Sequence, residues 1–289
     1  MACRTCFQCN ILIESNMKLK KAFRAIILPV ILAVSSCSPK FFVQISDPQL
    51  GFFSNNKDFE KEKVLMDRII KEVNRIRPDM VVFSGDLVHD RNNMSQLEGF
   101  EQMCKEIDSR IPIYYIPGNH DIGNDASHGE VLKFIERYGS DRFVHKGKGY
   151  TVIGFNSCVI KADTEYEEAE FAWLEENIRK AGSKNPVIVV AHHPFFIKSH
   201  DEKELYYNIK PDLRMKYLKM FEQYGVDLIL SGHKHKRADG EYNGMVLFTA
   251  GAAGKPFKHG SGISVIEIKN GKPEVRYVKV DSFPIEINK

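Results

Sequence analysis

Apolar and polar positions alternate along the chain after residue 40 with two different periods. Short apolar runs recur, and most are followed by stretches in which apolar residues return every three or four positions. The first kind predicts strands and the second predicts amphipathic helices. The strands expected are Phe41–Ile45, Met80–Phe83, Ile113–Ile116, Tyr150–Asn156, Val187–Ala191, Leu228–Leu230, Val246–Thr249, Ile263–Ile268 and Val275–Val280. The helices expected are Phe59–Ile76 (with Val64, Leu65, Ile69, Val73 and Ile76 on one face), Gln96–Ile107, Gly129–Tyr138, Glu167–Lys180 and Pro211–Tyr224.

The order of these elements predicts an α/β fold. Alternation of strands and helices is typical of a mostly parallel sheet with helices on its outside. The last three strands have no helices between them, so we expect them to form hairpins in a second sheet. The sequence shows no repeat, low-complexity tract or linker within this pattern. The expected architecture is therefore a two-sheet α/β sandwich forming a single domain over residues 41–281.

Residues able to bind metals follow five of the predicted strands. The groups are Asp47-Pro48-Gln49, Ser84-Gly85-Asp86, Gly118-Asn119-His120-Asp121, His192-His193-Pro194 and Gly232-His233-Lys234-His235. Ligands of such sheets bind beyond the carboxyl ends of the strands, so we expect the five groups to share one site. One group alone is typical of an ordinary turn, but five such groups, each after a different strand, indicate chemistry. Imidazole and carboxylate ligands suit Mn, Fe, Zn, Co or Ni better than a calcium cage, and two such ions can hold a phosphate group.

In this order the groups resemble the motifs of the calcineurin-like metallophosphoesterase superfamily, and the resemblance covers nearly all of residues 41–280. It implies a hydrolase in which a metal-bound hydroxide attacks the phosphorus of a phosphate ester. It also implies two divalent metal ions as cofactors, which we expect to be Mn, Fe, Zn or a mixture. The implied ligands are Asp86 as the bridge, Asp47 and His235 at the first ion, and Asn119, His192 and His233 at the second.

The same resemblance implies roles for residues around the metals. His120 would contact the phosphate and protonate the leaving oxygen, and either Asp121 or Asp90 would orient it. His89 stands where purple acid phosphatases carry a tyrosine, so we expect no tyrosinate–iron site and place His89 among the substrate contacts. His193, next to a ligand in the motif, is expected to support that ligand or to pack beside it.

Gln49 departs from most of the superfamily, which has a histidine at this position. A branch of calcineurin-like phosphoesterase domain proteins, which includes a protein serine/threonine phosphatase, also reads Asp-Pro-Gln. The chain is similar to that branch at Gly-Asp-Leu-Val-His and at Leu205-Tyr206-Tyr207-Asn208. We therefore expect Gln49 to bind the first metal, directly or through water, and more weakly than an imidazole would. Metal dependence should then be stronger than in relatives that carry histidine there.

The stretch 195–213 between two of the motifs is too irregular for a clean helix or strand. Its position predicts that it overhangs the site, where Tyr206, Tyr207 and Asn208 would contact substrate. The alternative is an ordinary surface loop.

Charge narrows the classes of substrate. The formal net charge is +3, but without residues 1–36 the chain has 36 basic and 37 acidic residues. A nuclease favours a basic groove, so no nucleic-acid partner is expected.

Phosphomonoesters, including phosphoproteins, are the favoured phosphate-ester substrates, and small phosphodiesters or cyclic nucleotides are the alternative. A non-catalytic metal- or ligand-binding protein of the envelope is the alternative from another class. The oligomeric state stays open.

Residues 17–37 have the pattern of an export signal. A basic start precedes the apolar run Ala25–Val34, which is shorter than the roughly 20 residues needed to span a bilayer. The following Val34-Ser35-Ser36-Cys37 resembles a bacterial lipobox, which implies a lipid anchor at Cys37 in the bacterial cell envelope, periplasmic or at the surface. A plain cleaved signal or a single-span anchor is the alternative. Residues 1–16 precede a complete signal, so we expect translation to start at Met17.

Overall fold

The computed structural model describes residues 40–287. The expected upstream stretch 1–16 and the expected signal segment 17–37 lie outside the described residues. Among the residues described, no helix has both the length and the apolar character needed to cross a membrane.

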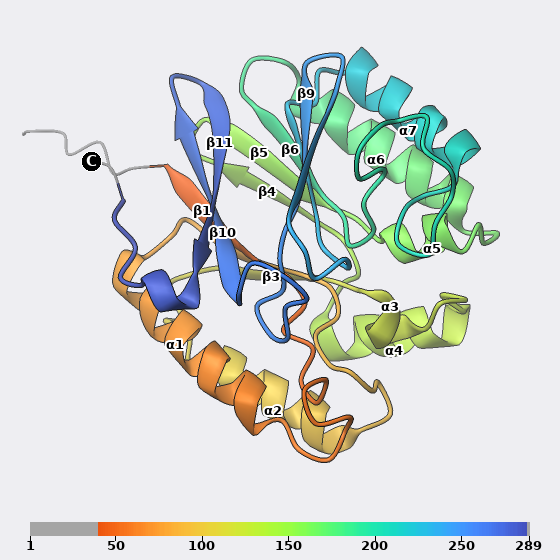
Figure 1. Ribbon diagram of the computed structural model, residues 1–289. Helices are drawn as coiled ribbons and strands as arrows, with labels where there is room; N and C mark the ends of the chain where they lie inside the picture. The colour runs from red at the N-terminus through yellow and green to blue at the C-terminus, as the bar shows by residue number, and fades with distance from the viewer. Residues whose placement is uncertain (1–39, 288–289) are drawn as a thin grey trace, which may run out of the picture. The chain divides into compact units, whose positions relative to one another are not determined.

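Two sheets form the centre of the fold (Figure 1). The five-stranded sheet has the order β11-β10-β1-β2-β3 and consists of β1 (Phe41–Ile45), β2 (Val81–Ser84), β3 (Ile113–Ile116), β10 (Gly262–Lys269) and β11 (Lys272–Lys279). The six-stranded sheet has the order β4-β5-β6-β7-β9-β8 and consists of β4 (Phe143–Gly147), β5 (Tyr150–Gly154), β6 (Val187–Val190), β7 (Leu228–Ser231), β8 (Ala238–Tyr242) and β9 (Met245–Thr249). Strands β1-β2-β3 and β5-β6-β7-β9 run parallel, whereas β4, β8, β10 and β11 are antiparallel to their neighbours.

Helices cover the outer faces of both sheets. They are α1 (Glu60–Ile76), α2 (Met94–Cys104), α3 (Asn119–Ile122), α4 (His128–Tyr138), α5 (Ser157–Lys161), α6 (Glu167–Ala181) and α7 (Pro211–Gln223), with a 3-10 helix at Val280–Ser282. Figure 1 shows α1 and α2 beside the first sheet and α6 and α7 beside the second. The resulting order of layers is helix, sheet, sheet, helix, as the two-sheet sandwich predicts.

The two sheets enclose a core made almost entirely of strand residues. Phe42 and Val82 of the first sheet meet Ile188 and Leu230 of the second in one buried cluster. Their neighbours along each strand belong to a second cluster, which packs the sheets against the helices. This division follows from the alternation of side chains along a strand, and it explains why the parallel strands read as continuous apolar runs.

The buried face of α1 is turned relative to the expected one. The helix buries Met66, Ile69 and Val73, whereas Val64, which we expected on this face, is 59% exposed. The buried face instead includes Glu62, whose carboxylate accepts the backbone N–H of Phe53 at 2.7 Å.

Strands β4 and β8 were not predicted from the hydrophobic pattern. Both are edge strands with a single neighbour, and their sequences FVHKG and ADGEY are largely polar. An edge strand buries little and avoids apolar runs, so the pattern that marks central strands is absent. The expected grouping of the last three strands was also wrong, because the unpredicted strand β8 is the hairpin partner of β9. Only β10 and β11 pair as a hairpin of the three, and they extend the first sheet beside β1, while β9 pairs with β7 and β8 in the second.

Hydrogen bonds join the carboxyl ends of the central strands of both sheets. The Gln44 side-chain amide donates to Ser84 Oγ at 3.0 Å in the first sheet and to the Ser231 carbonyl at 3.1 Å in the second. The backbone N–H of Asp47 donates to the Gly85 carbonyl at 3.2 Å. The loops that follow β1, β2 and β7 are therefore held together at one edge of the sandwich.

Candidate metal centre

Two groups of buried ligand residues lie at this edge. One consists of Asp47, Asp86 and His235, and the other of His192, His193 and His233. Within each group the candidate ligand atoms all lie within 4.8 Å of one another. All six residues are buried. The structure therefore brings the predicted ligands together as two adjacent clusters.

In the first group, His235 and Asp47 face each other. His235 Nε2 lies 3.4 Å from Asp47 Oδ1. His235 Nδ1 lies 2.6 Å from the Lys255 carbonyl, which only accepts, so Nδ1 carries the proton and Nε2 keeps its lone pair for a ligand. Burial lowers the pKa of His235, but the charge and hydrogen bond of Asp47, together with the Lys255 carbonyl, outweigh it, and the net shift is upward.

Asp86 connects the two groups. Its Oδ1 lies 3.4 Å from His192 Nε2 and accepts the backbone N–H of His120 at 2.9 Å. Burial raises the pKa of Asp86, but the charge and hydrogen bond of His192 lower it far below its usual range. A carboxylate held ionised between two ligand clusters has the position that a bridging ligand requires.

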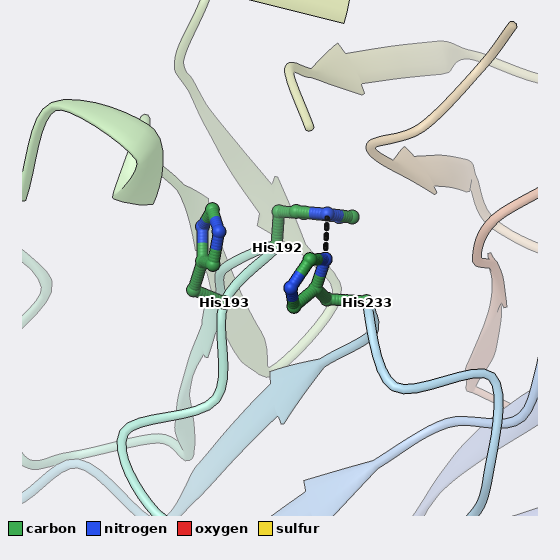
Figure 2. Close-up of side chains that lie close together, drawn as sticks. All are labelled: His192, His193 and His233. Carbon is green, nitrogen blue, oxygen red and sulfur yellow. Dashed lines mark hydrogen bonds between the residues drawn. The ribbon is translucent and has the colours of Figure 1, made fainter. Parts of the chain in front are cut away.

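The second group is built from imidazoles (Figure 2). His192 Nδ1 lies 2.9 Å from the Ser84 carbonyl, which only accepts, so Nδ1–H donates and Nε2 is the nitrogen that would bind a ligand. The contact of 3.1 Å between that Nε2 and His233 Nδ1 is the dashed line in Figure 2. Asn119 Oδ1 lies 3.3 Å from the same Nε2. Three donor atoms predicted for the second ion thus converge on one point.

The charges of these imidazoles differ in the metal-free protein. Burial lowers the pKa of His192, but Asp86 raises it to about 9. The pKa of His233 is lowered to about 4, first by burial and then by the charge of His192. One proton is thus held between His192 and Asp86, where a cation would replace it.

His193 is the member of the second group that the motif did not select. Its ring centroid lies 4.5 Å from that of His233, and Figure 2 shows it beside the other two rings. Its Nδ1 is buried with no hydrogen-bond partner among residues 40–287. Burial, followed by the charge of His233, places the pKa of His193 well below its usual value. His193 is therefore a neutral imidazole beside the cluster, and its adjacency to His192 in the sequence was the signal for it.

Left-handed backbone conformations mark the ligand turns. Asp47, Gln49, Asp86, His233 and His235 have φ between 42° and 66°. Such a conformation costs on the order of 1–3 kcal/mol in a residue other than glycine and persists only where the surrounding structure enforces it. The strain at five positions of one site indicates that function, rather than stability, fixes these turns.

Two glycines allow the ligand turns to approach one another. A Cβ at Gly118 would lie 2.2 Å from Asp86 Oδ1, and a Cβ at Gly232 would lie 2.6 Å from Asp47 Oδ2. Both distances are far below van der Waals contact. Any larger side chain at either position would displace the carboxylate that it meets.

Gln49 is buried next to the first group and has a side-chain oxygen that could serve as a ligand. It is 2% exposed, and its side-chain Oε1 has no hydrogen-bond partner in the part of the chain that the structure describes. A buried amide oxygen left without a partner costs about 1–3 kcal/mol, which a cation would offset. Its backbone N–H donates to the Asp86 carbonyl at 2.9 Å, beside the first group. Carboxylate, imidazole and amide donors together fit two divalent cations.

The orientation of His120 differs from the expectation. Its Nδ1 lies 2.7 Å from the backbone carbonyl of His89, so neither Asp90 nor Asp121 orients the ring. The Asp121 carboxylate instead accepts the backbone N–H groups of Leu87 at 2.9 Å and Gly118 at 2.8 Å. Burial and then the charge of Asp86 raise the pKa of Asp121 to about 7. Asp121 thus ties together the two loops that carry Asp86 and His120.

The predicted substrate contacts His89 and Tyr206 lie on either side of the site. The His89 ring stacks between His120 and Phe52, with centroid distances of 4.8 Å to each. Tyr206 is 63% exposed, its hydroxyl accepts from Asn119 Nδ2 at 3.1 Å, and its ring lies 5.1 Å from that of His233. The 195–213 stretch therefore reaches the metal centre through Tyr206.

The other two residues expected in this contact lie differently. The Tyr207 ring packs under Lys234 Nζ at 4.5 Å. Asn208 is fully buried, accepts the Leu205 N–H at 2.7 Å and donates to Glu202 at 2.6 Å. The structure corrects the prediction for Asn208, because both ends of its amide are used inside its own loop.

Comparisons with known proteins agree with this geometry. The family model described as "Calcineurin-like phosphoesterase" matches residues 42–237. "Serine/threonine-protein phosphatase CPPED1" of Danio rerio is 27% identical over 264 residues, which cover 84% of this chain and 85% of the relative. The fold is similar to that of a dimetal phosphatase from Danio rerio (TM-score 0.61, 12% identity, 84% of this chain and 97% of the other). It is also similar to purple acid phosphatase PPD1 from yellow lupin (TM-score 0.64, 15% identity, 86% and 53%). The chain therefore belongs to the calcineurin-like phosphoesterase family.

Proposed function

We propose that this protein is a metal-dependent phosphomonoesterase whose substrates include phosphoproteins. The observation that carries the proposal is the convergence of two buried ligand clusters on Asp86, directly beside His120. The family supports hydrolysis of phosphate esters in general. The relatives named serine/threonine-protein phosphatase favour monoesters, and specifically phosphoproteins, over the alternative of small phosphodiesters.

The residues that would hold the metals follow from the two clusters. Asp47, His235 and Gln49 would bind the first ion, Asn119, His192 and His233 the second, and Asp86 both. When bound, such ions supply Lewis acidity that activates water and stabilises charge on phosphoryl oxygens. Mn, Fe and Zn all suit these donors.

His120 is placed to handle the proton of the leaving group. Its Nδ1–H donates to the His89 carbonyl, so Nε2 is the nitrogen available to substrate. The His120 backbone N–H is fixed on Asp86, which positions the ring next to the ligand clusters. A protonated Nε2 can give its proton to the ester oxygen as the phosphorus–oxygen bond breaks, and the alcohol leaves neutral.

A metal-reconstitution assay tests the function. The purified protein, stripped with chelator, is expected to lose hydrolysis of p-nitrophenyl phosphate, and Mn²⁺ is expected to restore it. The rate with p-nitrophenyl phosphate should exceed that with bis-p-nitrophenyl phosphate at least tenfold, because a monoester presents the dianionic phosphate that two cations bind best. Faster turnover of the diester would favour the phosphodiesterase. Metal binding without turnover of either ester would favour the non-catalytic binding protein.

We also propose that the protein is exported and lipid-anchored at Cys37 in a bacterial cell envelope. The export-signal pattern of residues 17–37 supports this. Lys40 precedes β1 at its amino end, whereas the metal centre lies at the carboxyl end, about 16 Å away along five residues. The anchor would therefore join the sheet at the end opposite the metal centre. Intact mass measurement of the mature protein should find a lipid-modified cysteine at the N-terminus. An unmodified residue 37 would contradict the proposal.

A further inference from the structure

A cavity of about 390 Å³ opens on the His120 side of the metal centre. It is lined by Arg91, Asn119, His120, Gly123, Asn124, Asp125 and Tyr206. Pockets for small ligands begin at about 300 Å³, so the cavity has room for a small polar group. Because it borders both the ligand Asn119 and the proton donor His120, it lies where the leaving alcohol of a phosphomonoester would stand.

Arg91 is the cationic residue in this lining. Its Nε donates to Glu130 Oε2 at 3.1 Å. Neither Nη1 nor Nη2 forms a hydrogen bond among residues 40–287, where Glu130 is the one acid that pairs with Arg91. A guanidinium has five N–H donors in a rigid fork, so the end of the fork is left available to a ligand.

The ion pair with Glu130 does not cancel the charge of Arg91. The Glu130 carboxylate also binds Lys133 Nζ at 2.6 Å, so one carboxylate serves two cations. This group of two cations and one carboxylate therefore keeps one net positive charge beside the cavity, whose lining also holds the Asp125 carboxylate. The carboxylate at Oε2 fixes the guanidinium through Nε, which orients the fork without occupying its end.

Gly123 leaves room for the guanidinium at the cavity wall. It has a φ of 82°, and a Cβ there would lie 3.4 Å from Arg91 Nη2 and 2.6 Å from Asp125 Oδ1. Arg91 and Asp125 therefore both reach the same glycine of the cavity lining, yet they form no ion pair within the described structure.

We propose that this cavity is the leaving-group subsite and that Arg91 selects phosphomonoesters whose leaving alcohol carries a carboxylate close to the ester oxygen. The inference rests on the proposed function. A guanidinium fork binds a carboxylate through two parallel hydrogen bonds, which few other side chains can supply. In the reaction, water adds its oxygen to phosphorus and the phosphorus–oxygen ester bond breaks. The hydroxy acid takes a proton from His120, and inorganic phosphate is the second product.

The test compares 2-phosphoglycolate with ethyl phosphate, which has a methyl group in place of the carboxylate. For the Mn²⁺-loaded protein, kcat/KM for 2-phosphoglycolate is expected to be at least tenfold higher. Arg91→Met should reduce this ratio to within about twofold of unity, and Arg91→Lys should retain part of it, since the charge remains without the fork. Arg179→Met, which removes an exposed guanidinium on α6 away from this cavity, should retain the ratio and serves as the matched control.

Failure of the subsite and failure of the proposed function give different results. The subsite alone is overturned if p-nitrophenyl phosphate is hydrolysed but 2-phosphoglycolate and ethyl phosphate have equal kcat/KM. It is also overturned if the ratio of these two kcat/KM values is unchanged in Arg91→Met. If no ester is hydrolysed, the proposed function is overturned, and calorimetric binding of 2-phosphoglycolate then decides the subsite. Binding at least tenfold weaker to Arg91→Met than to the natural protein supports it, and equal binding overturns it.

Discussion

Asp86→Asn is expected to abolish metal-dependent hydrolysis, with a loss of at least about 10³-fold in kcat/KM. Asp86 is the carboxylate that both ligand clusters share, since it lies in the first group and 3.4 Å from His192 of the second. A neutral amide at this position offers one oxygen instead of two and removes the charge that binds two cations. The variant should therefore lose both ions, whereas loss of a ligand from one cluster alone leaves the other intact.

Metal-induced stabilisation measures this loss independently of turnover. A ligand present at about 100 times its Kd stabilises the folded state by about 2.7 kcal/mol. For a domain of this size that corresponds to a rise in Tm of about 5–10 °C on adding Mn²⁺. The rise should be below about 2 °C in Asp86→Asn, and bound metal measured by elemental analysis should fall in parallel.

The Asp86→Asn variant is expected to stay folded without metal, so loss of metal binding can be distinguished from unfolding. The charge of Asp86 acts to raise the pKa of both Asp47 and Asp121, so Asp86 is repelled by two other enclosed carboxyl groups. A neutral residue at position 86 relieves this repulsion and offsets the lost contact with His192. If Asp86→Asn kept the full rise in Tm with Mn²⁺, Asp86 would not be a ligand.

The strand ends made the site predictable from the sequence. Each predicted ligand follows an apolar run that marks a buried parallel strand, and parallel strands bring their carboxyl ends to one edge. Asp47 and Asp86 therefore belong to one site although nothing links them in sequence. The polar edge strands β4 and β8 carry no such apolar signal. The two edges of the six-stranded sheet and the pairing of β9 with β8 could therefore not be predicted from the sequence.

Contacts made by backbone or by loops were not predictable in the same way. The group that orients His120 is a backbone carbonyl, which every residue has, so the sequence pointed to the acids instead. Asn208 lies in the expected loop, yet its amide is used to shape that loop. Arg91 follows the second motif in a loop, and only the fold brings it to the same cavity as His120.

His120→Asn is expected to lower kcat by about 10²–10⁴-fold for an alkyl phosphate such as ethyl phosphate, the range that a proton donor contributes. The loss with p-nitrophenyl phosphate should be much smaller, because p-nitrophenolate is stable as an anion and leaves without a proton. The His120 side chain belongs to neither ligand cluster, so the rise in Tm with Mn²⁺ should be retained. His128→Asn, at an exposed position on α4, is the matched control and should change neither quantity.

The difference between the two substrates decides what His120 does. A proton donor acts on the leaving oxygen alone, so its removal must cost more as that oxygen becomes more basic. A residue that only holds the phosphate contacts the part common to both substrates, and its removal costs the same for each. Equal losses for ethyl phosphate and p-nitrophenyl phosphate would therefore assign His120 to phosphate binding. They would also leave the cavity beside it without a proton donor for the alcohol that Arg91 is proposed to select.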